Sequence, residues 1–294
     1  MSGQPEQLTT AQVKELKARA LEVRMNIVRM LEQAKSGHPG GSLSSSDILS
    51  CLYFSGVLQA KADDPQWEQR DRFILSKGHA APVLYAVLAE FGYIPHSWLD
   101  SLRKLHSHLQ GHPDMRKCPG VEASTGSLGQ GLSIASGLAL GLAHDADKIG
   151  RCPDVYVLTG DGELQEGQNW EALMYAAHKK ISNLIALVDS NNLQIDGKVS
   201  EVNSLGNLAE KFKSFGWQVF EANGHDMQEI YAALKAAQAY KQGPCAVIFS
   251  TTKGKGISFM ENQCSWHGKA PSAQEAAGAL EELQAALSCL REEA

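Results

Sequence analysis

Short apolar segments alternate with helical patterns along the second half of this 294-residue chain. The apolar segments have the length and composition of β-strands, and they occupy residues 155–159, 184–189, 217–221 and 246–251. The helical patterns between them cover residues 169–180, 208–215 and 227–241. Strands that are apolar throughout and separated by helices indicate a parallel sheet that is buried on both faces. The alternation therefore predicts an α/β fold, with helices on both faces of a parallel sheet.

Both ends of the chain also show helical periodicity. Residues 10–35 place apolar side chains three and four positions apart, after Thr9 and Thr10 as candidate caps. Residues 272–290 are rich in alanine and have leucines at helical spacing. Because neither an internal repeat nor a linker is evident, we expect a single domain over residues 1–294, with a helix at each end.

Composition and charge argue against several classes of protein. With 43% hydrophobic and 20% charged residues, the chain can bury a sizeable core. Its formal net charge of -6 provides no basic surface of the kind that nucleic-acid-binding proteins use. The six cysteines form no C-x-x-C pair, and no run of about 18 apolar residues occurs. We therefore expect a cytoplasmic protein with reduced thiols that binds neither nucleic acid nor a membrane.

A carboxylate between two glycines follows the first apolar segment. The glycines around Asp161 let the backbone turn tightly and approach a ligand, and the Asp161 carboxylate suits a hard cation. The next apolar segment ends at Asp189 and is followed by Asn191. Because ligands bind beyond the carboxyl ends of parallel strands, Asp161 and Asn191 can share one Mg²⁺ with phosphate oxygens. Each motif alone is also ordinary turn chemistry.

A glycine-rich loop adds a candidate anion site. Gly126, Gly129 and Gly131 precede a helix of small residues. Backbone amides at the start of a helix favour anions such as phosphate. For this loop alone, a flexible turn before a closely packed helix is the simpler interpretation.

Four histidines beside glycine or proline are candidate site residues, because a loop there can aim the ring. They are His38, His79, His112 and His267. Histidine titrates near neutral pH, which suits proton transfer to and from sugar hydroxyl and carbonyl groups. We interpret the other six histidines as surface residues or as satisfied core residues.

Together these segments resemble the N-terminal half of transketolase. The matching stretches are SGHPGG, RFILSKGHAA, GHPD, STGSLGQG, GDGELQEG, NNLQIDG and SWHGK, in the order of the family. The resemblance runs from about residue 10 to residue 270 and implies the thiamine diphosphate-binding fold. In that family, the segment that corresponds to residues 161–191 holds the diphosphate of thiamine diphosphate through Mg²⁺ or Ca²⁺.

The resemblance also implies roles for individual residues. The implied metal ligands are Asp161, the Asn191 side chain and the Leu193 backbone carbonyl. The implied contacts of thiamine diphosphate are His79, Gly126, Ser127, Leu128, Asp161, Gly162, Asn191, Lys253 and His267. The residues implied to bind and polarise the sugar are His38, His112 and His267. Glu166 corresponds to an acidic residue that lies at the subunit interface and connects the two cofactor sites.

The chain departs from the family at two places. At Gly40 and Gly41 many relatives have a hydroxyl or another small side chain, so the resemblance implies no side-chain contact there. A full transketolase also carries two further domains, which include the glutamate that activates the aminopyrimidine and much of the basic site for a sugar phosphate. We therefore expect this chain to be inactive alone, because the cofactor must be activated to act as a nucleophile.

The resemblance and the length together imply a split enzyme. A separate subunit would supply the pyrimidine-binding and C-terminal domains, and two copies of each subunit would form a heterotetramer. A truncated chain would have the same sequence features.

Three hypotheses about function stay open. The first is a transketolase subunit that transfers a two-carbon glycolaldehyde unit from a ketose to an aldose through a thiamine diphosphate ylid. The second is a related subunit, of the 1-deoxyxylulose-5-phosphate synthase or 2-oxo acid dehydrogenase α type, which the four histidines and SWHGK disfavour. The third is a non-catalytic subunit that binds the cofactor. The sugar itself stays open among pentose phosphates, branched sugars and sulfosugars.

Overall fold

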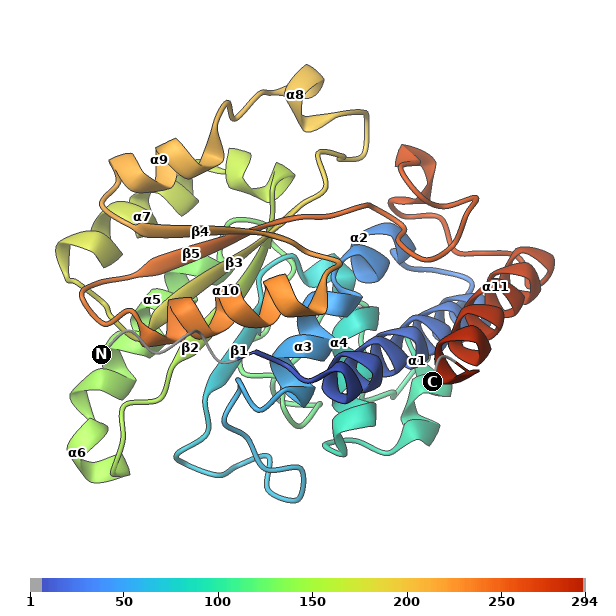
Figure 1. Cartoon of the computed structure of the whole chain (residues 1–294), viewed down its shortest axis with the longest axis horizontal. Coiled ribbons are helices and arrows are strands. Elements are labelled where there is room, and N and C mark those ends of the chain that lie inside the picture. Colours follow the sequence, from blue (N-terminus) through green and yellow to red (C-terminus); the bar gives the residue numbers. More distant parts are fainter. Residues whose placement is uncertain (1–6, 293–294) are drawn as a thin grey trace.

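The computed structural model describes residues 7–292 and places a five-stranded sheet between two layers of helices (Figure 1). The predicted domain of residues 1–294 includes residues 1–6 and 293–294, which lie outside the described residues. The strands are β1 (Arg72–Leu75), β2 (Val155–Gly160), β3 (Leu184–Ser190), β4 (Gln218–Asn223) and β5 (Cys245–Ser250). Their order is β1-β2-β3-β5-β4, and every neighbouring pair is parallel. The predicted α/β fold is confirmed.

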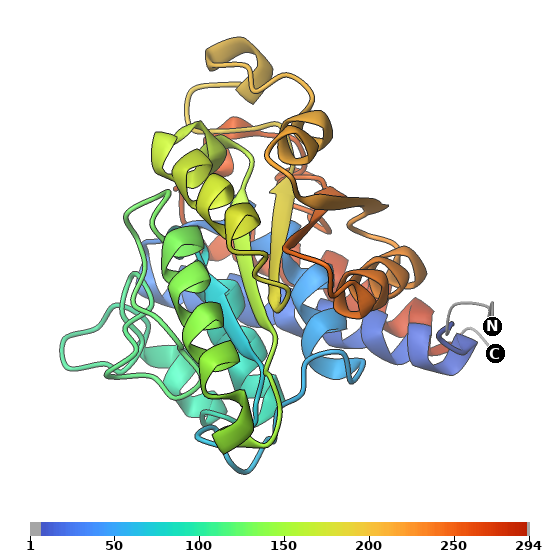
Figure 2. The ribbon, with the colours of Figure 1, turned by 90° about the vertical axis from the view of Figure 1, so that its left-hand side faces the viewer.

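Helices cover both faces of the sheet, because successive residues of a strand point to opposite sides. In β2, Tyr156 and Leu158 join the core of one face, whereas Val155 and Val157 join the core of the other. The first face is covered by α1 (Thr10–Ala34), α3 (Ser46–Phe54), α4 (Ala81–Phe91) and α10 (Met227–Ala239). The second face is covered by α5 (Gly131–His144), α7 (Gly167–His178) and α9 (Leu208–Ser214). Figure 2 shows α5 and α7 on one side of the strands and α10 on the other.

The two predicted terminal helices are present and pack against each other. Helix α1 lies beside α11 (Ala273–Glu292) at the outer side of the first face (Figure 1). At the start of α1, the Thr9 side chain accepts the Gln12 N–H and the Gln12 side chain accepts the Thr9 N–H, which forms a capping box. These contacts explain why the helix begins where the sequence predicts.

Short helices occupy the loops around the sheet. They are α2 (Pro39–Ser44), α6 (Ala146–Ile149), α8 (Val199–Val202), η1 (Gly78–Ala80), η2 (His96–Ser101), η3 (Gly162–Gln165) and η4 (Cys264–Trp266). Within residues 7–292 no helix is long and apolar enough to cross a membrane. All six cysteines are free.

Two features of the sheet differ from the sequence-based prediction. The prediction that the strands are apolar throughout is wrong for β4, which carries Gln218, Glu221 and Asn223 and is partly exposed. Because β4 is an edge strand that pairs only with β5 within the described sheet, it is not buried on both sides. The sequence pattern also did not predict β1, whose four residues are too few to establish a period.

Candidate active site

The loops that follow four of the strands converge on one cavity of about 200 Å³. Each loop contributes a predicted site residue to its wall: His79 after β1, Asp161 after β2, Asn191 after β3 and Lys253 after β5. The predicted residues that line it are His79, Leu128, Asp161, Gly162, Glu166, Asn191, Leu193, Lys253 and His267. The other four, His38, His112, Gly126 and Ser127, lie outside its described lining. The carboxyl edge of the sheet therefore brings most of the predicted site together.

Asp161 lies at the base of this cavity. The parallel register pairs Gly160 with Asp189, which places the loop after β2 beside the loop after β3. The Asp161 carboxylate accepts the N–H of Gly162 at 2.8 Å through Oδ1 and the N–H of Asn192 through Oδ2. Burial, together with the negative charge of Asp189, raises the pKa of the Asp161 carboxyl to about 6. A bound cation would favour its charged form.

The other two predicted metal ligands lie on the same wall. The Asn191 Nδ2 atom donates to Asp189 Oδ2 at 3.1 Å, and Asn191 Oδ1 accepts the Leu193 N–H at 3.0 Å. The Leu193 carbonyl accepts a hydrogen bond from Lys253 Nζ at 3.0 Å. One carboxylate, one amide oxygen and one carbonyl are a donor set that Mg²⁺ or Ca²⁺ accepts when ligand oxygens complete the shell. The described residues contain no group of three or more His, Cys, Asp or Glu that could hold a metal.

The glycine-rich loop allows two close approaches. A Cβ atom on Gly126 would lie 2.9 Å from His112 Cγ, and one on Gly129 would lie 2.7 Å from Glu166 Cβ. Gly129 also has a φ of +85°, which favours glycine. Its N–H donates to Glu163 Oε1 at 3.0 Å, so this amide is used within the protein. Ser127 and Leu128, between the two glycines, are exposed.

Three of the four predicted histidines form a cluster. The ring centroids of His38, His79 and His267 are separated by 5.0–5.4 Å. Burial and nearby positive charges lower the pKa of His38 to about 4 and that of His267 to about 3. At neutral pH these rings are uncharged, and each can donate through one nitrogen and accept through the other.

Two contacts define what this cluster can offer a ligand. Lys253 Nζ lies 2.9 Å from His267 Nδ1, and because an ammonium group only donates, Nδ1 accepts and the ring proton lies on Nε2. His38 Nδ1 is buried and has no hydrogen-bond partner among the described residues. Buried polar atoms are rarely unpaired in proteins, and this one belongs to the histidine cluster beside the cavity.

His112 and Glu166 lie at the margins of the site. His112 is exposed beside Gly126, and partial burial together with Arg103 lowers its pKa. Glu166 is exposed at the N-cap position of α7 and lines the cavity. Both can therefore meet a ligand or another chain.

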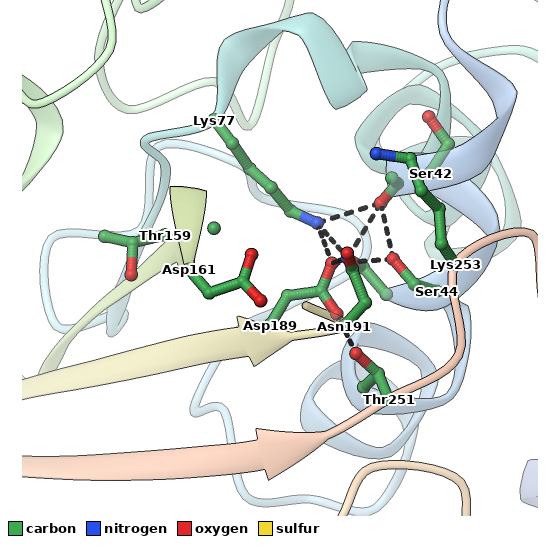
Figure 3. Close-up of polar contacts among 12 residues, drawn as sticks. Ser42, Ser44, Lys77, Thr159, Asp161, Asp189, Asn191, Thr251 and Lys253 are labelled. Atoms are coloured by element: carbon green, nitrogen blue, oxygen red, sulfur yellow. Dashed lines mark hydrogen bonds and ion pairs between the residues drawn. The ribbon is translucent and has the colours of Figure 1, made fainter. Parts of the chain in front are cut away.

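A buried charged cluster that the sequence analysis did not identify lies behind the predicted metal ligands (Figure 3). Lys77 Nζ donates to Asp189 Oδ2 at 2.5 Å, and the Ser44 hydroxyl donates to the same oxygen at 2.6 Å. The Thr251 hydroxyl donates to Asp189 Oδ1. Despite burial, which opposes the shift, the charge of Lys77 and these hydrogen bonds lower the pKa of the Asp189 carboxyl. The only sequence signal was a charged residue that ends an apolar segment.

Comparison with known proteins identifies the family. The family model described as the thiamine diphosphate binding domain of transketolase matches residues 16–285. The chain belongs to the transketolase family. One of the subunits of the apulose-4-phosphate transketolase of Actinobacillus succinogenes is 44% identical over 271 residues, which cover 92% of this chain and 96% of that one. A 6-deoxy-6-sulfo-D-fructose transketolase subunit of a Clostridium species is 41% identical, over 84% of this chain and 90% of that one.

The solved structure of transketolase from Campylobacter jejuni matches with a TM-score of 0.81 and 33% identity. The match covers 94% of this chain but 48% of the Campylobacter chain, so this protein spans about half of that transketolase. These findings confirm the predicted family, the thiamine diphosphate-binding fold and the prediction of an N-terminal transketolase subunit. They favour this hypothesis over the two related enzyme types.

Proposed function

We propose that this chain holds the diphosphate end of thiamine diphosphate in a two-polypeptide transketolase. The assembled enzyme transfers a two-carbon glycolaldehyde unit from a ketose donor to an aldose acceptor. The main support is that the loops after β2, β3 and β5 bring Asp161, Asn191 and Lys253 to one cavity beside three neutral histidines. Oxygen ligands, the Lys253 ammonium group and proton-transfer groups thus surround one cavity.

The residues present fit a metal-bound diphosphate. We assign Asp161, the Asn191 side chain and the Leu193 carbonyl as ligands of Mg²⁺, with the other predicted cofactor contacts around them. Lys253 is buried on the same wall and adds a positive charge that suits phosphate oxygens. The unpartnered Nδ1 atom of His38 is a second sign of a ligand. When bound, thiamine diphosphate supplies a carbon nucleophile and an electron sink.

The histidines bind the sugar and move protons in this proposal. His267, with its proton on Nε2, can donate a hydrogen bond to a carbonyl oxygen of the sugar. His38 and His112, with lowered pKa values, are neutral at pH 7 and can accept a hydroxyl proton. General acid and base groups of this kind typically contribute about 10² to 10⁴ in rate.

The partner subunit is supported by an apolar surface on neighbouring helices. Ile134 and Leu140 on α5 are 40% and 39% exposed, and Met174 and Tyr175 on α7 are 60% and 45% exposed. Helices α5 and α7 pack against each other, and large apolar side chains exposed on both favour a protein interface. We propose that this face meets the other subunits of a heterotetramer, two of each kind, near Glu166. The partner would supply the pyrimidine-binding and C-terminal domains.

We further propose a ketose donor with an anionic group. The two subunit relatives are named for apulose-4-phosphate and for 6-deoxy-6-sulfo-D-fructose, which carry a phosphate and a sulfonate. An ordinary pentose phosphate also carries an anionic group and belongs to this class, so an uncharged ketose is the alternative donor. The proposal also retains the expected cytoplasmic location, which the free cysteines support.

The test is reconstitution with a candidate partner chain that contains the missing domains. We expect transfer activity with a ketose donor only when both chains, thiamine diphosphate and Mg²⁺ are present. His112→Ala should lower turnover by about 10² or more while cofactor affinity stays nearly unchanged. Activity with pyruvate but no ketose would support a related enzyme type, and cofactor binding without activity with any partner would support the non-catalytic hypothesis.

A further inference from the structure

We propose that Lys77 and Asp189 are a positioning pair that orients Asn191 as a metal ligand. The pair lies at the base of the cavity, where Lys77 is 2% exposed and Asp189 is fully buried. This inference deepens the proposed function, because it depends on the assignment of Asn191 to the metal. The contacts of the pair, taken one partner at a time, support it.

Lys77 directs all of its hydrogen bonds into the protein. Its Nζ atom donates to Asp189 Oδ2, to the Gly41 carbonyl at 2.9 Å and to the Ser45 hydroxyl at 2.6 Å. An ammonium group has three protons, so these contacts use every donor that Lys77 has. Lys77 therefore acts through Asp189 and the α2 segment, although it lies close to the proposed diphosphate position.

Asp189 joins the segments that carry the site. Its carboxylate receives hydrogen bonds from Lys77 after β1, Ser44 in α2 and Thr251 after β5 (Figure 3). Its backbone carbonyl accepts the Asp161 N–H at 3.2 Å. A buried carboxylate needs such partners, because burying an unpaired charge is costly. One residue thus ties together four loops around the cavity.

The contact between Asp189 and Asn191 decides which end of the Asn191 amide faces the site. Asp189 Oδ2 accepts hydrogen bonds from Lys77 Nζ and the Ser44 hydroxyl, and the same oxygen faces the Nδ2 donor of Asn191 at 3.1 Å. Asn191 Oδ1 then points the other way, where it accepts the Leu193 N–H and keeps a second lone pair for a cation. Lys77 Nζ donates to the same Asp189 Oδ2 atom, which fixes the position of the carboxylate and so maintains this orientation.

Asp189→Asn tests the orientation with almost no change in shape. An asparagine at this position can donate to Asn191 Oδ1, which would allow the amide to turn its NH₂ group toward the cation. We expect the affinity for Mn²⁺, titrated in the presence of thiamine diphosphate, to fall by about 10- to 100-fold, as is typical when the partner of a metal ligand is removed. Isothermal titration calorimetry of the full chain measures this affinity.

Asp71→Asn is the matched control. Asp71 is 2% exposed and pairs with Arg151 at 2.6 Å, but it precedes β1 at the opposite end of the sheet. This variant removes the same charge from a buried ion pair, and we expect it to bind Mn²⁺ as the wild type does. The electron paramagnetic resonance spectrum of bound Mn²⁺ should change in Asp189→Asn alone, which a general loss of stability would not produce.

A double variant covers the case in which a single substitution prevents folding. Lys77→Met with Asp189→Leu removes both charges and leaves Asn191 without its acceptor, so weaker Mn²⁺ binding is again expected. Wild-type affinity in Asp189→Asn, or equal weakening in Asp71→Asn, would overturn the inference alone. If the wild-type chain itself binds no Mn²⁺ with thiamine diphosphate, the metal site of the proposed function and this inference both fail.

Discussion

Charged groups are buried at both ends of the central sheet, but their interaction partners differ between the two ends. At the amino end, the Asp71 carboxylate pairs with Arg151 and accepts the N–H groups of Gln59 and Asp154. Asp154 in turn pairs with Lys241 at 2.6 Å. Each carboxylate there has a cation from this chain.

At the carboxyl end some groups have no such partner. Asp161 is held by backbone amides and has the like charge of Asp189 nearby, which together with burial raises its pKa. His38 Nδ1 is buried without a hydrogen bond among the described residues. Perturbed groups of this kind in a cleft are typical of functional sites. The amino end therefore pairs its buried carboxylates with cationic side chains of this chain, whereas the carboxyl end keeps groups that suit a ligand.

Of the proposed substitutions, removal of the Asp161 carboxylate should have the largest effect on metal affinity. Asp161→Ala deletes a proposed metal ligand, so we expect Mn²⁺ affinity in the presence of thiamine diphosphate to fall by more than about 100-fold, beyond the usual cost of a partner of a ligand. The free energy of unfolding should change little, because the lost hydrogen bonds from Gly162 and Asn192 are offset by removal of a buried carboxylate next to Asp189. Calorimetry and chemical denaturation measure the two quantities. Unchanged affinity would remove Asp161 from the metal site.

The amino end should respond in the opposite way. Asp71→Asn weakens the contacts to Arg151 and to the backbone, so we expect the free energy of unfolding to fall by about 1–3 kcal/mol. Cofactor affinity should stay at the wild-type value when it is measured at a temperature well below the midpoint of thermal unfolding, where both proteins are folded. If Asp71→Asn lost more cofactor affinity than its fraction of unfolded protein can explain, the two ends of the sheet would be coupled.

Glycines with similar backbone angles allow a matched comparison of the two ends. Gly129 has a φ of +85° near the cavity, and Gly150 has a φ of +83° before β2. Alanine at either position costs about 1–2 kcal/mol for the left-handed backbone. Only Gly129→Ala also places a Cβ atom 2.7 Å from Glu166 Cβ, because the nearest atom to Gly150 is the flexible end of Gln69 at 3.2 Å.

We therefore expect both alanine variants to unfold at lower denaturant concentration, with the larger shift in Gly129→Ala. Reduced activity of the assembled enzyme should be confined to Gly129→Ala, because Glu166 lines the cavity. Equal activity loss in Gly150→Ala would show that the effect is one of stability rather than of the site.

The sequence predicted most of the fold because periodicity reports burial. The central strands β2, β3 and β5 and the helices α1, α7, α9, α10 and α11 have a clear pattern of apolar residues. Helices α3 and α4 were not predicted, because they are buried along nearly their whole length and show no amphipathic period. β4 is partly exposed at an edge, and β1 has four residues, so neither matches the pattern of a strand buried on both faces. Local periodicity does not identify an edge strand or a very short one.

The candidate site was predictable where function leaves a local motif. Asp161 and His79 stand beside glycines, which are visible in the sequence. The cluster of Lys77, Asp189 and Thr251 is different, because its members come from separate segments. Only the strand order β1-β2-β3-β5-β4 brings these segments together, and the order is a property of the whole sheet. The residues that remained hidden are those that contact the predicted site residues from other segments.

A further expected effect is the pH dependence that His38 adds to the free energy of unfolding. His38 has an ordinary pKa of 6.5 in the unfolded chain, but burial and the charge of Arg103 lower it to about 4 in the folded chain. Between these values the unfolded state binds more protons, so the free energy of unfolding falls as the pH falls from 6.5 toward 4. His38→Asn removes this contribution while other groups continue to titrate. Denaturation at about pH 7, 6 and 5 should therefore show a shallower decline in His38→Asn than in the wild type, and parallel declines would contradict a neutral, buried His38.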